Sequence, residues 1–162
     1  MGAEVGVGPG AVRAVGSGIE EFFTDVPFET TLRSNELLTE IRVPAPVHGS
    51  GGAYVKLERK VGDYAIAGVA AYITLDTNGT VTYAGIGLTN VGQTPIKARN
   101  AEQALLGKPL NDASVHQAAD LAAAASQPIS DTRGPAEYKR DMVHTLTVRA
   151  LRKALVRATG GE

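Results

Sequence analysis

The segment AYVKLERKVGDYAIAGVAAYITLDTNGTVTYAGIGL, which runs from Ala53 to Leu88, decides the fold of this chain. It contains three apolar runs with strand-forming residues, and short turn signals separate them. The runs predict strands over Ala53–Lys60, Ile66–Leu75 and Val81–Leu88. The Asn78-Gly79 pair is a strong hairpin signal, because both residues tolerate a positive φ angle. Three consecutive strands with such short connections predict an antiparallel meander.

Helical periodicity replaces the strand pattern after Pro95. It predicts three helices, which end at Gly107, at Pro128 and near Ala158. The second begins at Asn111 or Asp112, and the third begins at Pro135. The apolar face of the first consists of Ala98, Ala101, Leu105 and Leu106. Because the strands precede the helices, the sequence predicts an α+β fold: a three- to four-stranded antiparallel sheet followed by three helices packed on one face.

The third predicted helix combines an apolar stripe with many cations. The stripe consists of Tyr138, Met142, Leu146, Ala150, Ala154 and Leu155. The cations are Lys139, Arg140, Arg149, Arg152, Lys153 and Arg157. One interpretation is a helix that also docks a partner, and the other is a helix whose cations simply favour its C-terminal end.

The first part of the chain reads as a separate piece of structure. Short strands at Glu4–Val7 and Ala11–Val15 are predicted to form a hairpin with its turn at Gly8-Pro9-Gly10. A helical turn at Ile19–Phe23 and a strand at Leu37–Val43 follow. The small and polar residues His48-Gly49-Ser50-Gly51-Gly52 indicate a linker, so we place a domain boundary there, between residues 1–47 and 48–162.

Composition excludes several classes of function. The net charge of the 162 residues is -1, so no global field attracts nucleic acid. The absence of cysteine excludes thiolate metal sites and iron–sulfur clusters held by this chain alone. The longest uncharged apolar run, Tyr64–Leu75, has twelve residues and is too short to span a bilayer. We therefore expect no transmembrane segment, and with no signal-like start we expect a cytoplasmic location.

The sequence contains no recognisable catalytic or metal-binding pattern. The three histidines, His48, His116 and His144, lack the spacing of a metal site or a nucleophile triad. The carboxylates form no obvious acid/base pair. We predict no catalytic residue and no metal ligand in this chain.

Two segments are denser in functional groups than folding requires. In Lys56–Ala65, several cations lie along a predicted strand, and a Gly-Asp turn follows that presents Tyr64. It is either a charged strand with a common turn, or a loop whose Tyr64 lies against a flat ligand while Lys56 and Arg59 complement a negative charge. Ser130–Tyr138 contains an Asp131 and Arg133 pair, which is either a structural clamp or an interface.

These segments carry a resemblance to a known family. The motifs are Arg59-Lys60-Val61-Gly62-Asp63-Tyr64-Ala65, Ile86-Gly87-Leu88-Thr89-Asn90-Val91 with Thr94-Pro95, and Asp131-Thr132-Arg133-Gly134-Pro135-Ala136-Glu137-Tyr138. Their order, with a basic C-terminal helix after them, resembles the FAD-carrying medium subunit of molybdenum hydroxylases, above all aerobic-type carbon monoxide dehydrogenase and more distantly xanthine dehydrogenase. The resemblance implies an α+β C-terminal domain over residues 48–162. It also implies that residues 1–47 are the tail of a flavin-binding domain.

The resemblance also implies roles for five residues. Tyr64 would contact the flavin ring, Asp63 would fix the turn, and Leu38 would pack beside the ring. Lys56 and Arg59 would place positive charge near the reducible edge, which favours the anionic reduced flavin and raises its potential.

The partners implied by the resemblance are an iron–sulfur small subunit and a molybdopterin large subunit. The intact subunit would pass electrons from the iron–sulfur clusters to an external acceptor. The Gly-rich loops that hold the FAD pyrophosphate in such subunits are missing here, so the chain is a fragment or a shortened relative. Alone, it is expected to bind FAD weakly and to be inactive. The alternative is a stand-alone interaction domain without flavin, which docks partner subunits.

Overall fold

A computed structural model describes residues 4–9, 17–24 and 26–161 of the chain. The chain divides into two compact units, Met1–Pro46 and Val47–Glu162. Across the described residues, none of the helices is both long enough and apolar enough to cross a membrane.

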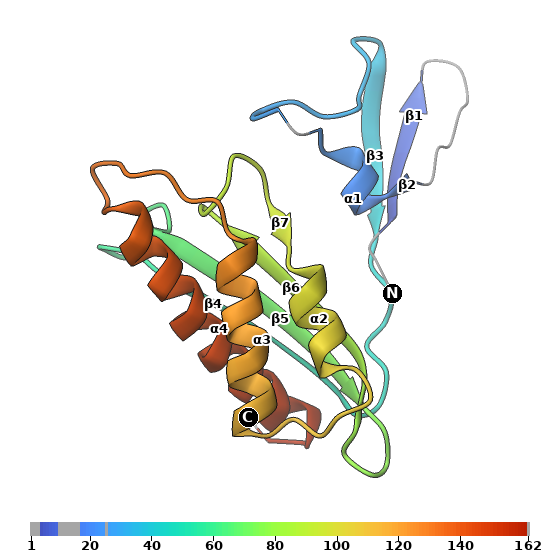
Figure 1. Cartoon of the computed structure of the whole chain (residues 1–162). Helices are drawn as coiled ribbons and strands as arrows, with labels where there is room; N and C mark the ends of the chain where they lie inside the picture. Colours follow the sequence, from blue (N-terminus) through green and yellow to red (C-terminus); the bar gives the residue numbers. More distant parts are fainter. Residues whose placement is uncertain (1–3, 10–16, 25, 162) are drawn as a thin grey trace. The chain divides into compact units, whose positions relative to one another are not determined.

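The larger unit is an antiparallel sheet covered on one face by helices (Figure 1). Its strands follow the order β4-β5-β6-β7, with bounds Ser50–Leu57, Ala67–Leu75, Val81–Thr89 and Ile96–Lys97. The helices α2, α3 and α4 span Arg99–Leu105, Asp112–Ala125 and Ala136–Ala158. Helix α4 packs on β4 and β5, α2 packs on β6, and α3 lies against both α2 and α4. The predicted α+β fold, with its helices after the sheet, is confirmed.

Strand alternation positions the core between the sheet and the helices. In β5 the side chains of Val69, Ala71 and Ile73 are buried toward the helices, while Ala70 between them is exposed. The hairpin from β5 to β6 turns at Asp76, whose carboxylate accepts hydrogen bonds from the backbone N–H groups of Asn78 and Thr80. These contacts fix the register that aligns the apolar residues of the two strands on one face.

Part of the predicted linker belongs to the sheet. Strand β4 begins at Ser50, so Ser50, Gly51 and Gly52 are strand residues and not a flexible connection. A Cβ atom at Gly51 would overlap the carbonyl oxygen of Ala154 and the amide nitrogen of Ala158, both in α4. The glycine allows the helix backbone to approach the strand, which is a second reason for glycine in a strand besides flexibility.

The helices follow the predicted pattern with two corrections. Helix α3 begins with a capping box between Asn111 and Ser114. Leu106 lies beyond the end of α2 and is 45% exposed, because the chain becomes extended there and leaves the helical face. In α4, Tyr138 is also exposed at 40%, whereas Val143, Thr147 and Leu151 are fully buried outside the predicted stripe. The buried surface of α4 is wider than one stripe, because the helix contacts both the sheet and α3.

The smaller unit contains a three-stranded sheet with β1 in its centre. Its strands are β1 at Glu4–Pro9, β2 at Ser17–Gly18 and β3 at Glu36–Arg42, and the helical turn α1 spans Ile19–Phe22. The predicted turn at Gly8-Pro9 is wrong, because β1 continues through Pro9, which pairs with Glu36. Pairing with the distant strand β3 extends β1 beyond the local turn signal. Gly10 and the predicted strand Ala11–Val15 lie outside the described residues.

Candidate functional site

The connection between β4 and β5 presents an exposed tyrosine on a well-fixed loop. Gly62 has a φ angle of +83°, which suits glycine and makes the turn possible. The backbone N–H of Asp63 donates to the Lys60 carbonyl at 3.1 Å, and the N–H of Ile66 donates to the Leu57 carbonyl at 2.7 Å. Tyr64 between these anchors is 79% exposed.

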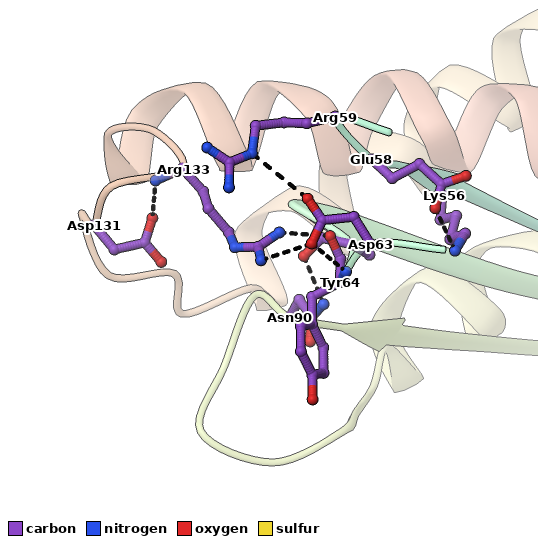
Figure 2. A network of polar contacts seen from close by, with 9 residues as sticks. Lys56, Glu58, Arg59, Asp63, Tyr64, Asn90, Asp131 and Arg133 are labelled. Carbon is purple, nitrogen blue, oxygen red and sulfur yellow. Dashed lines mark hydrogen bonds and ion pairs between the residues drawn. The ribbon is translucent and has the colours of Figure 1, made fainter. Parts of the chain in front are cut away.

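A guanidinium from a distant loop binds this connection (Figure 2). Arg133 Nη1 donates to the backbone oxygen of Tyr64 at 2.6 Å, and Nη2 donates to Asp63 Oδ1 at 3.0 Å. The guanidinium carbon lies 5.7 Å from the centroid of the Tyr64 ring, within the range of a cation–π contact. Arg59 approaches the other carboxylate oxygen of Asp63 at 3.6 Å.

The carboxylate of Asp63 is the centre of this cluster. Its Oδ1 atom also accepts a hydrogen bond from the backbone N–H of Tyr64 at 2.8 Å. The Arg133 hydrogen bond, followed by the Tyr64 N–H and the charges of Arg133 and Arg59, holds the pKa of Asp63 below its ordinary value. Asp63 therefore stays ionised near neutral pH and binds two cations at once.

A buried lysine anchors the loop that carries Arg133. The side chain of Lys139 in α4 is 4% exposed, and its Nζ atom lies 2.7 Å from Asp131 Oδ2 and 3.0 Å from the Ile129 carbonyl. Asp131 Oδ1 accepts a hydrogen bond from the backbone N–H of Arg133 at 2.8 Å. The Lys139 contact, then the Arg133 N–H, lowers the pKa of Asp131. The Asp131–Arg133 segment thus makes the contacts within this chain that a structural clamp requires.

A pocket of about 350 Å³ opens beside Tyr64, which is within the size range of small-molecule sites. Asn90 supports its wall: with a φ angle of +63° it donates from Nδ2 to the Ala65 carbonyl at 2.6 Å. The lining residues are Tyr64, Ala65, Ile66, Asn90, Gly92, Gln93, Gln127, Ile129, Asp131, Arg133 and Lys139.

The structure brings three of the five predicted site residues together: Arg59, Asp63 and Tyr64. Lys56 instead pairs with Glu58, with 2.6 Å between Nζ and Oε2, and this hydrogen bond raises the pKa of Lys56. Leu38 lies on β3 of the smaller unit, where it is 41% exposed.

Sequence reasoning missed the link between Arg133 and the Gly62–Tyr64 turn, and it gave Asn90 and Lys139 no role at this site. Asn90 and Arg133 both belong to the motifs that carry the family resemblance, but no local spacing connects them to Tyr64.

Two of the histidines lie close together, away from the residues around Tyr64. The rings of His116 and His144 lie 5.5 Å apart, and His144 Nε2 lies 3.4 Å from Asp120 Oδ1. Within the described part of the chain, no group of three or more His, Asp or Glu side chains is placed to hold a metal ion.

Comparison with known proteins shows the family. Residues 52–154 match the model of the CO dehydrogenase flavoprotein C-terminal domain. The medium chain of carbon monoxide dehydrogenase from Afipia carboxidovorans is 42% identical over 151 residues, which cover 93% of this chain and 51% of that protein. The xanthine dehydrogenase FAD-binding subunit of Escherichia coli O157:H7 is 26% identical over 136 residues, which cover 83% of this chain and 46% of that protein.

The fold is also similar to a solved structure. Carbon monoxide dehydrogenase from Hydrogenophaga pseudoflava, in a form that lacks the Mo-pyranopterin moiety of its molybdenum cofactor, has a chain with a TM-score of 0.89 and 42% identity. The match covers 96% of this chain and 53% of that one. This chain thus spans about half the length of the relatives it matches. The family match confirms the resemblance to flavin-carrying medium subunits, and the chain belongs to the CO dehydrogenase flavoprotein C-terminal domain family.

Proposed function

We propose that this chain supplies one wall of a flavin site in an FAD-carrying medium subunit, with Tyr64 in contact with the isoalloxazine ring. The observation that carries the proposal is a ring 79% exposed on a loop held by Asp63 and Arg133. An aromatic side chain held in this way loses little conformational freedom when a flat ligand covers it.

The residues around Tyr64 fit the edge of a flavin ring. Flavins offer a flat aromatic surface with polar atoms at the rim, and the pocket beside Tyr64 combines apolar walls with amide and guanidinium donors. When bound, FAD supplies the one- and two-electron chemistry. Of the chain's own residues, Tyr64 would lie against the ring surface, and Asp63 would hold the turn that presents it. The contact of Leu38 with the ring stays a prediction from the family resemblance.

Charge near Tyr64 would tune the bound cofactor. Arg59 and Arg133 share the single carboxylate of Asp63, so the cluster has a net positive charge. A positive charge near the ring stabilises the negative charge that reduction brings, and it therefore raises the reduction potential. Lys56 contributes less than its formal charge, because Glu58 lies 2.6 Å from it.

The wider assembly is part of the same proposal. Residues 1–47 are the tail of the flavin-binding domain, and residues 48–162 are the C-terminal domain of the subunit. The relative from Afipia carboxidovorans is named a medium chain, which fits an assembly of several subunits. The subunit would receive electrons from iron–sulfur clusters on a small subunit and pass them to an external acceptor. Substrate oxidation would occur at molybdenum on a large subunit, in the cytoplasm.

The experiment is the substitution Tyr64→Leu in the intact subunit and in this chain. Because Tyr64 is largely exposed, we expect the melting temperature of this chain to change little. In the intact subunit we expect lower flavin stoichiometry or a shifted reduction potential. Tyr54→Leu is the matched control, since Tyr54 is also exposed but lies on the open face of the sheet. A large loss of stability in this chain, with unchanged flavin behaviour in the subunit, would show that Tyr64 only packs.

A further inference from the structure

We infer that Arg133 is a positioning residue that sets the orientation of Tyr64 toward the ligand, an inference that rests on the flavin contact proposed above. Arg133 belongs to the loop before α4 and lies 69 residues from Tyr64 in the chain. Its side chain is 21% exposed, so it is held between the two loops and not simply displayed at the surface. Figure 2 shows the guanidinium directed at Asp63 and Tyr64.

Both polar groups of the Tyr64 backbone are held by the same ion pair. The N–H of Tyr64 donates to Asp63 Oδ1, and the carbonyl of Tyr64 accepts from Arg133 Nη1. Asp63 and Arg133 bind each other at 3.0 Å. The peptide groups on both sides of the Tyr64 Cα are therefore held, and the direction of its Cα–Cβ bond is held with them.

The guanidinium also restricts the ring itself. Its carbon lies 5.7 Å from the centre of the Tyr64 ring, where a cation is attracted to the aromatic face. Arg133 therefore acts on Tyr64 in two ways, through the backbone and through the ring. A lysine at this position would keep the charge but would lack the planar fork that reaches two oxygens at once.

The loop of Arg133 is itself anchored in the core. Lys139 binds Asp131 and the Ile129 carbonyl from a buried position, and Asp131 binds the backbone N–H of Arg133. A continuous set of contacts thus runs from buried Lys139 through Asp131 and Arg133 to exposed Tyr64. An exposed ring gains a fixed orientation from the rigid helix α4, which is what a preorganised contact requires.

The test begins with amide hydrogen exchange in this 162-residue chain. In Arg133→Ala, we expect the Tyr64 amide to exchange about ten- to a hundredfold faster, because the hydrogen bonds to a charged group that fix this loop are lost. The Ile86 amide in the core is expected to keep its rate. Arg133→Lys should restore part of the protection, and Arg140→Ala, which removes an exposed cation of α4, should change nothing at Tyr64. An unchanged Tyr64 rate in Arg133→Ala would overturn the inference.

The second measurement is the reduction potential and the FAD stoichiometry of the intact subunit, with the same variants and Tyr64→Leu. We expect both Arg133→Ala and Tyr64→Leu to change flavin behaviour, with Arg133→Lys in between. If Tyr64→Leu changes it and Arg133→Ala does not, the inference is overturned while the proposed function stands. If neither variant changes it, the proposed function is overturned and the inference with it.

Discussion

The substitution Gly51→Ala tests how closely α4 approaches the sheet. Gly51 lies in β4, at the place where the sequence alone indicates a flexible linker. An added methyl group would meet the Ala154 carbonyl oxygen and the Ala158 amide nitrogen, and it would lie 3.0 Å from the Ala158 Cα atom. All three are backbone atoms of one helix, so no side chain can rotate away to make room. The C-terminal turns of α4 would have to move as a body.

The size of the effect follows from this geometry. Overpacking in a close-packed interior costs about 1–3 kcal/mol, and the rigid obstacle places Gly51→Ala at the upper end of that range. Replacement of glycine also removes freedom from the unfolded chain, which offsets about 0.4–1 kcal/mol. We therefore expect a net loss of about 2 kcal/mol in the free energy of unfolding. For a unit of this size, that corresponds to a decrease in melting temperature of about 6–12 °C.

Thermal and urea unfolding of the two variants Gly51→Ala and Gly87→Ala provide the measurement. Gly87 is the matched control: it lies in β6, has no positive φ angle, and a Cβ atom there would meet nothing within 4 Å. We expect Gly87→Ala to be neutral or slightly stabilising. If the two variants unfold with the same midpoint, residues 50–52 form a connection, and α4 does not pack against β4 as described.

Three further predictions concern other contacts of the chain. Glu102→Ala should lower the free energy of unfolding by about 1–3 kcal/mol, because the carboxylate accepts a hydrogen bond from the buried Ile86 N–H at 2.9 Å. Glu102→Gln keeps an acceptor and should lower the free energy of unfolding less, which urea titrations of both variants can measure. The lowered pKa values of Asp63 and Asp131 mean that their stabilising contacts are complete above the ordinary carboxyl pKa and are lost as pH falls below about 4. Melting temperatures should therefore depend less on pH in this acid range for Asp63→Asn than for the wild type, and an equal dependence would contradict the pairing. Finally, this chain alone should not retain FAD, because the Gly-rich loops that hold the FAD pyrophosphate in the resembled subunits are missing from its sequence. A chain that purifies as a yellow protein, and whose affinity for FAD is micromolar or tighter when measured by fluorescence quenching, would refute this prediction.

The sequence is enough to predict three strands and the three helices of the larger unit, because their signals are local. The two-residue strand β7, Ile96–Lys97, is not predicted, because only its pairing with β6 marks it. Strand alternation marks β5, the cap at Asn111 marks the start of α3, and Pro135 marks the start of α4. The errors occur where a tertiary contact overrides a local signal. Gly51 has the composition of a linker, but its lack of a side chain serves the approach of α4.

In the candidate site, too, the local features could be predicted from the sequence, and the long-range contacts could not. Gly62, Asp63 and Tyr64 are neighbours in the chain, so their turn and its exposed ring could be proposed from the sequence. The partner of that turn is Arg133, and only the packing of α4 beside β4 and β5 brings the two loops together.

The role of the Asp131–Arg133 pair could not be decided from the sequence. An aspartate two residues before an arginine is compatible with a structural clamp or with an interface. In the structure, Asp131 binds the backbone of Arg133 and the ammonium of Lys139, which leaves the guanidinium directed at Asp63. Each carboxylate thus pairs with a cation outside its own turn, and the two loops become one rigid support. These ion pairs hold the two loops against each other and leave Tyr64 exposed, which is the arrangement that the proposed flavin contact requires.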